Sequence, residues 1–205
     1  ANFGEVKLRI SALAKTRAEA EAMILPIEQQ LRAIGGLDCY GADEDSLVTV
    51  VGQLLQTTGS TLAVAESCTG GGLGAMITAV SGSSNYFWGG VIAYDNSAKV
   101  KLLGVNPDDL AQFGAVSAVV AEQMAAGVRD RLHTTWGLSI TGIAGPTGGS
   151  VEKPVGLVYI GLAQQTGVQS VKYQFGAGRG REWVRLLSAC SALDQLRREL
   201  LASKT

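Results

Sequence analysis

The chain has 205 residues and a mass of 21.3 kDa, a length that suits one ordinary domain, alone or with a small appendage. Hydrophobic residues make up 46% and charged residues 17%, which excludes a disordered chain because apolar surface is plentiful and solvating charge is scarce. Lys and Arg number 17 against 18 Asp and Glu, a net charge of −1, so the long-range attraction behind non-specific binding to nucleic acid or anionic membranes is missing. We therefore expect no direct nucleic-acid contact and no membrane partner.

Targeting and redox signals are weak throughout the chain. No apolar stretch approaches the roughly 20 residues of a membrane helix, and residues 1–10 lack the charged-then-apolar order of a signal peptide. Cys39, Cys68 and Cys190 are odd in number and form no CxxC pair, which argues against both a disulfide framework and a zinc site. We expect a cytoplasmic protein without a metal.

Residues 1–45 predict a small β-α-β fragment. Residues 6–13 resemble a strand, and Ile24, Ile27, Leu31 and Ile34 then recur at helical spacing, with Pro26 either kinking this helix or marking its first turn. Gly35 and Gly36 end the helix, and residues 37–41 resemble a second strand. A domain boundary is expected near residue 45.

From residue 46 onward, strands and helices alternate, which is typical of a layered α/β fold. Two runs, residues 155–163 and 168–175, are separated by a short turn ending in Gly167 and predict an antiparallel hairpin, so the sheet should be mixed, with helices on both faces. The other expected strands are residues 61–67, 89–95 and 136–140. The expected helices are a glycine-rich one that ends near residue 80, and residues 46–56, 96–103, 117–132 and 182–201.

Glycine is the one unusual count: 27 residues, about 13% of the chain against an average of about 7%. Residues 66–74, ESCTGGGLG, join the end of a strand to the head of a helix. Such a turn leaves backbone N–H groups, here those of Cys68, Thr69, Gly70 and Gly71, free to receive an anion or a developing oxyanion. Ser67 would be a nucleophile in that field. The alternative is that Ser67 only caps the helix.

A serine nucleophile needs a base, and His133 is the single histidine in the chain. His133 is expected at the end of a helix, beside the terminal carbonyls, and the GxSxG elbow of serine hydrolases is absent. Lys99 is the other candidate, because partial burial would lower its pKa, and Tyr94 could orient the proton. Solvated lysines at positions 99 and 101 are the alternative interpretation, and Cys68 is a rival nucleophile.

The second glycine cluster, residues 141–149 (TGIAGPTGG), follows a strand at the place where open α/β sheets hold ligands. A nucleotide phosphate or ribose would fit there, and a tight structural loop is the alternative. Arg179, Arg181 and Arg185 could supply a cation for a phosphate, although some of them belong to a solvated helix face.

Four segments in this order and spacing, AESCTGGGLGAMIT, SGSSNYFWGGVIAYDNSAKVKLLGV, GAVS and TGIAGPTGG, closely resemble the CinA C-terminal family, the nicotinamide-nucleotide amidases. The resemblance covers about residues 46–205, and residues 1–45 look like the end of the CinA middle, KH-like domain. It implies a three-layer α/β/α domain with a five-stranded mixed sheet. The implied reaction hydrolyses nicotinamide mononucleotide to nicotinic acid mononucleotide and ammonia, without a cofactor, in a homo-oligomer that is most often a dimer.

The resemblance assigns the catalytic positions to Ser67, Tyr94 and Lys99. Either Arg179 or Arg181 would face the substrate, with Arg181 preferred because Arg181 and Arg185 keep the family's four-residue spacing. The alternative function is a non-catalytic nucleotide-binding or partner-binding module of a larger CinA-type protein. The expected oxyanion and substrate contacts are Cys68, Thr69, Gly70, Gly71, Asn96, Thr141, Gly142, Ala144, Gly145 and Arg181.

Overall fold

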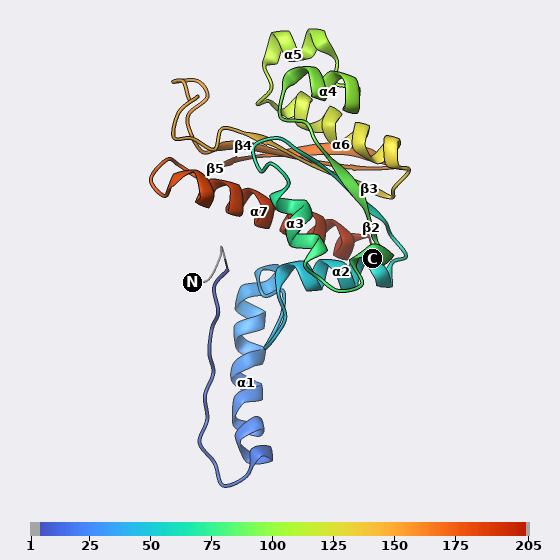
Figure 1. Cartoon of the computed structure of the whole chain (residues 1–205). Helices are drawn as coiled ribbons and strands as arrows, with labels where there is room; N and C mark the ends of the chain where they lie inside the picture. The colour runs from blue at the N-terminus through green and yellow to red at the C-terminus, as the bar shows by residue number, and fades with distance from the viewer. Residues whose placement is uncertain (1–4, 204–205) are drawn as a thin grey trace. The chain divides into compact units, whose positions relative to one another are not determined.

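The computed structural model describes residues 5–203 and divides the chain into two compact units, with the division between Asp45 and Ser46 (Figure 1). The first unit is built on one long helix and the second on a sheet covered by helices. The site discussed below lies wholly in the second unit.

The first unit contains helix α1 (Arg17–Gly35) and a short 3-10 turn, η1 (Gly36–Asp38). Thr16 caps α1 by accepting a hydrogen bond from the Glu19 N–H, and Pro26 lies inside the helix rather than in its first turn. No residue of α1 is buried within the chain, so its stability does not come from packing of an apolar face here.

The two strands expected to flank this helix are not formed in the described part of the first unit. Residues 6–14 are extended without strand pairing, apart from a single bridge position at Glu5, and residues 36–38 form the 3-10 turn instead. A strand persists only where a neighbouring strand pairs its N–H and C=O groups, and the structure shows no such ladder over residues 6–14 or 39–41. Val6 and Leu8 are accordingly 79% and 66% exposed.

The second unit confirms the expected five-stranded mixed sheet, in the order β2-β1-β3-β4-β5. The three strands β2, β1 and β3 are parallel, whereas β4 runs antiparallel to both of its neighbours, β3 and β5. The β4–β5 hairpin is tighter than its sequence suggests, because Gln164 pairs with Gly167 and only two residues form the loop. The strands are β1 (Leu62–Glu66), β2 (Phe87–Ile92), β3 (Trp136–Gly142), β4 (Leu157–Gln164) and β5 (Gly167–Gln174).

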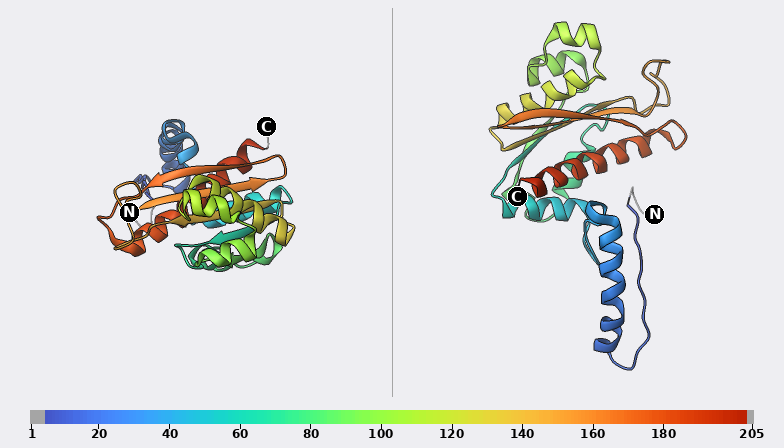
Figure 2. Two further views of the ribbon diagram at one scale, coloured as in Figure 1. Left: turned by 90° about the horizontal axis from the view of Figure 1, so that it is seen from above. Right: turned by 180° about the vertical axis from the view of Figure 1, so that it is seen from behind.

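Helices cover both faces of this sheet, which confirms the three-layer arrangement (Figures 1 and 2). In Figure 1, α2, α3 and α7 lie on one side of the sheet and α4, α5 and α6 on the other. The helices are α2 (Leu47–Thr57), α3 (Gly72–Thr78), α4 (Asn96–Leu103), α5 (Pro107–Phe113), α6 (Ala118–Leu132) and α7 (Gly180–Ala202), with a 3-10 turn η2 (Ser83–Asn85).

Part of the glycine excess serves packing rather than ligand binding. A Cβ atom on Gly161 of β4 would lie 2.3 Å from the Ala121 carbonyl oxygen of α6, and one on Gly137 of β3 would lie 2.0 Å from that of Ala125. The missing side chains let α6 approach the sheet closely, and Val120 and Met124 of this helix are fully buried against it. These glycines fix the layer spacing on which the site depends.

Candidate active site

The site forms where three parallel strands end at the same edge of the sheet. Ser67 follows β1, Ala93 follows β2, and Thr141 lies near the end of β3, with Glu66 and Ile140 paired across β1 and β3. A cavity of about 260 Å³ opens at this edge, as expected for an α/β sheet.

Most of the residues singled out from the sequence line this cavity, although they come from four separate segments of the chain. They are Ser67, Cys68, Tyr94, Asn96, Lys99, Thr141, Gly142, Ala144, Gly145 and Arg181. Thr69, Gly70 and Gly71 do not line it. Five lining residues escaped the sequence analysis as individual positions, namely Ala115, Val116, Ile143, Thr147 and Gly148.

Lys99 is a buried base candidate and not a solvated charge. Helix α4 begins after Asp95, whose carboxylate accepts a hydrogen bond from the Ser97 N–H, and its fourth residue, Lys99, is 1% exposed. The Lys99 Nζ donates to the carbonyl oxygens of Ala93 (2.8 Å) and Tyr94 (3.1 Å). Burial lowers the pKa of Lys99, against smaller opposing effects of nearby acidic groups. Lys101, in contrast, is exposed.

Ser67 continues the strand instead of capping the helix. Its N–H donates to the Ile140 carbonyl oxygen at 3.0 Å, which extends the β1–β3 ladder by one residue. Helix α3 has Gly71 at its N-cap and no side-chain cap there, so the capping interpretation of Ser67 fails. Ser67 is 9% exposed, and among the described residues no hydrogen bond joins its Oγ to the Lys99 Nζ.

Glu66, which the sequence analysis did not select, binds the N-terminus of α3. Its carboxylate is 2% exposed and accepts hydrogen bonds from the N–H groups of Gly71, Leu73 and Gly74 at 2.8–3.1 Å. The signal was available, since an acidic residue closing an apolar strand and directly preceding a glycine-rich helix start is a natural partner for unpaired N–H groups.

These contacts narrow the set of N–H groups that could receive an oxyanion. The N–H of Gly70 donates to the Ser67 carbonyl oxygen, and that of Gly71 to Glu66. Within residues 5–203, the N–H groups of Cys68 and Thr69 have no acceptor. Only these two remain from the four expected donors.

The rival nucleophiles and bases are poorly placed. Burial raises the pKa of the Cys68 thiol to about 11, so it is protonated at neutral pH and lacks the reactive thiolate. His133 is the C-cap of α6 with a left-handed φ of 51°, three residues before β3 begins. It therefore lies near the edge opposite Ser67, where it cannot serve as its base.

The three arginines at the start of α7 differ in their partners. Arg181 donates from Nη1 to the Gly145 carbonyl oxygen (2.9 Å) and from Nη2 to the Tyr94 hydroxyl (3.0 Å), so it joins the glycine loop to the rim of the cavity. Arg185 binds the Thr69 carbonyl oxygen at 2.7 Å. Arg179 lies over the Trp183 ring at 5.0 Å, away from the cavity. Of the two arginines that the sequence left open, Arg181 lines the cavity and Arg179 does not.

Comparison with known proteins identifies the family. The family model described as the CinA C-terminal domain matches residues 44–200, and that of the damage-inducible protein CinA KH domain matches residues 1–41. The chain belongs to the CinA family. CinA-like proteins of Synechococcus elongatus and Nostoc punctiforme are 68% and 65% identical to it, each over 98% of this chain.

Solved structures of the CinA superfamily agree with this assignment. The competence/damage inducible protein CihA from Agrobacterium tumefaciens is 36% identical with a TM-score of 0.71, covering 78% of this chain and 99% of that one. A CinA superfamily protein from Klebsiella pneumoniae is 29% identical with a TM-score of 0.73, covering 76% and 96%. The chain spans about half the length of the curated relatives it matches, 48% for the Synechococcus protein.

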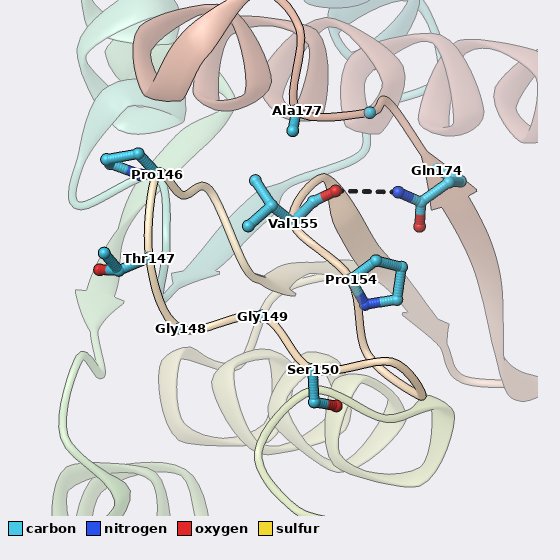
Figure 3. A pocket seen from close by; sticks show the side chains of 10 residues that line it. Pro146, Thr147, Gly148, Gly149, Ser150, Pro154, Val155, Gln174 and Ala177 are labelled. Carbon is cyan, nitrogen blue, oxygen red and sulfur yellow. Dashed lines mark hydrogen bonds between the residues drawn. The ribbon is translucent and has the colours of Figure 1, made fainter.

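A second cavity of this CinA chain, of about 500 Å³, adjoins the first and shares Thr147 and Gly148 with it. Figure 3 shows residues 146–150 along one side and Pro154, Val155 and Gln174 along the other, with the Gln174 amide donating to the Val155 carbonyl oxygen at 3.0 Å. No charged side chain lines this second cavity, whereas Arg181 lines the first.

Two further properties concern the described part of this CinA chain. No helix within residues 5–203 is both long and apolar enough to span a bilayer. Over the same residues, His, Cys, Asp and Glu side chains do not gather in groups of three that could hold a metal ion.

Proposed function

We propose that the second unit hydrolyses the carboxamide of nicotinamide mononucleotide, giving nicotinic acid mononucleotide and ammonia through a serine nucleophile. The observation that carries the proposal is the buried Lys99, whose pKa is lowered and which lines the same cavity as Ser67. A neutral amine beside a serine hydroxyl supplies the base that the exposed, distant His133 cannot supply.

The hydrogen bonds of Lys99 favour this role. A neutral amine has two N–H groups and one lone pair, and the carbonyls of Ala93 and Tyr94 can accept both N–H groups. The lone pair is then left to take the Ser67 proton. Catalytic hydrogen bonds are often long before substrate arrives, so the missing Ser67–Lys99 hydrogen bond is compatible with the proposal.

The proposed reaction proceeds in two halves. Ser67 Oγ attacks the carboxamide carbon as Lys99 takes its proton, the C–N bond breaks, and Lys99 returns the proton to the departing ammonia. Water then attacks the acyl-serine with Lys99 again as base, releasing the carboxylate and restoring Ser67. The N–H group of Cys68, which lines the cavity, would bind the oxyanion, a contribution of roughly 3 kcal/mol per donor in comparable sites.

Arg181 is the proposed anchor for the nucleotide. Its guanidinium is exposed at the cavity, and its bonds to Tyr94 and Gly145 leave N–H donors for a phosphate. Because the Tyr94 hydroxyl accepts from Arg181, its own proton can be donated to substrate. We thus assign Tyr94 to substrate orientation at the rim, next to the Ser67–Lys99 pair.

Substitution of Ser67 by Ala tests the proposal. Ammonia release from nicotinamide mononucleotide should disappear while circular dichroism shows an intact fold, whereas Cys68→Ala should keep most of the turnover. Retained turnover in the Ser67→Ala protein would end the proposal. Calorimetric binding of the nucleotide by a wild-type chain that releases no ammonia would instead favour the non-catalytic binding module.

The setting of the reaction is also a proposal. Cys39, Cys68 and Cys190 form no disulfide in the described part of the chain, as is usual in a reducing compartment, and we place the protein in the cytoplasm on that ground. Fractionation of cells that produce the full-length protein, with detection by antibody, tests this placement.

A further inference from the structure

Glu66 is the buried carboxylate closest in sequence to the proposed nucleophile, and the proposed mechanism does not use it. Its Oε2 accepts from the N–H groups of Gly71 (3.0 Å) and Leu73 (3.1 Å), and its Oε1 accepts from that of Gly74 (2.8 Å). No salt bridge to Glu66 occurs in the described part of the chain, so backbone N–H groups alone compensate its charge.

The hydrogen bonds of Glu66 fix one end of the turn that carries Ser67. At the other end, the Ser67 N–H is held by the Ile140 carbonyl oxygen of β3. Between these anchors, the Arg185 guanidinium binds the Thr69 carbonyl oxygen. The Glu66 carboxylate therefore holds N–H groups of this short segment while the Arg185 guanidinium holds one of its C=O groups. With peptide groups bound on both sides, the turn has little freedom to rotate.

The same bonds decide which N–H groups stay available to a ligand. Glu66 occupies those of Gly71, Leu73 and Gly74, so an incoming anion finds these donors already bound. Within residues 66–74 the N–H groups of Cys68 and Thr69 are left without an acceptor, and of these two residues Cys68 lines the cavity whereas Thr69 is fully buried.

We infer that Glu66 is a positioning residue: by binding the first N–H groups of α3, its carboxylate holds the Ser67 turn and restricts a substrate oxygen to the N–H group of Cys68. This inference rests on the proposed amidase function for its kinetic consequence. Its geometric content, the division of the N–H groups into bound and available ones, is independent of the substrate.

The kinetic test uses Glu66→Gln, which keeps the side-chain size but turns an NH2 group toward backbone N–H donors. We expect kcat for ammonia release to fall by about 100-fold or more, since loss of one oxyanion donor has that effect elsewhere. KM should stay within about threefold, because nucleotide binding through Arg181 is untouched.

Ser46→Ala is the matched control. Ser46 caps α2 by accepting the Thr49 N–H, and it does not line the cavity. This variant should lower the unfolding midpoint while leaving kcat unchanged. An equal loss of kcat in both variants would mean that Glu66 acts only through stability and would overturn the inference, as would a wild-type kcat in Glu66→Gln.

Amide hydrogen exchange tests the geometry without any turnover and without the risk that Glu66→Gln fails to fold. In the wild-type chain, the first group of amides, those of Gly71, Leu73 and Gly74, should exchange slowly, and the second group, the Cys68 amide alone, should exchange rapidly. Adding nicotinamide mononucleotide to the Ser67→Ala protein should protect the second group only. Equal exchange of both groups in the free protein would refute the inference, whereas absent wild-type turnover with the expected exchange pattern would refute the amidase proposal alone.

Discussion

Replacing Lys99 by Met separates the chemical role of its amine from the packing role of its stem. The side chain is 1% exposed, so Met keeps most of the buried methylene contacts and creates no large cavity. What disappears is the amine with its two hydrogen bonds to Ala93 and Tyr94. Lys101→Met, an exposed position on the same helix, is the control for loss of a positive charge.

The magnitudes follow from these contacts. Each of the two lost hydrogen bonds contributes about 0.5–1.5 kcal/mol, so their loss should lower the free energy of unfolding by about 1–3 kcal/mol. Part of this loss is offset, because the variant no longer has to desolvate an amine when it folds. A positioned general base contributes about 10²–10⁴-fold, so kcat should fall by that factor, or about 2.7–5.4 kcal/mol in activation free energy. The double variant Ser67→Ala/Lys99→Met should be no slower than either single variant, because the two residues act as one unit.

The assay is ammonia release from nicotinamide mononucleotide at saturating substrate, with urea unfolding of each variant measured in parallel. Lys101→Met should retain wild-type turnover. A Lys99→Met protein that is folded and turns over within about tenfold of wild type would show that Lys99 is not the base. Strictly multiplicative losses in the double variant would refute the idea that Ser67 and Lys99 act together.

Three other predictions follow from the site and the fold. Because burial lowers the pKa of Lys99, kcat/KM should rise with pH through an apparent pKa below the ordinary lysine value of 10.5, and a pH–rate profile that falls over this range, or rises only above 10.5, contradicts the assignment. Between the folded-state pKa and 10.5 the unfolded chain binds more protons than the folded chain, so the contribution of Lys99 to the free energy of unfolding increases as pH rises. Arg181→Ala should raise KM for nicotinamide mononucleotide at least about tenfold while Arg179→Ala leaves it unchanged, and equal effects in steady-state kinetics would mean that Arg181 does not bind the phosphate. Gly161→Ala should destabilise the second unit by about 1–3 kcal/mol in urea unfolding, since its Cβ would lie 2.3 Å from the Ala121 carbonyl oxygen, and wild-type stability would show that α6 can move away from the sheet without cost.

The candidate site was predictable where chemistry follows local sequence order. A residue at or directly after the end of a buried parallel strand, such as Thr141 or Ser67, must lie at the carboxyl edge of the sheet, so the motif and the strand pattern together locate it. Glu66 was missed because its partners are five to eight residues further along, and only the turn into α3 brings their N–H groups to its carboxylate. The choice between Arg179 and Arg181 likewise depended on which direction each side chain takes from the start of α7.

The sequence by itself determined the alternating elements of the second unit, because apolar periodicity and glycine breaks are local properties of the chain. It could not determine the extended segment before α1, since a strand pattern forms a strand only when a neighbouring strand pairs with it. Only the tertiary structure decided that Lys99 and not Lys101 is buried. A lysine pKa depends on how much water the surrounding layers exclude, and that is set by the packing of α4 and not by the order of residues within it.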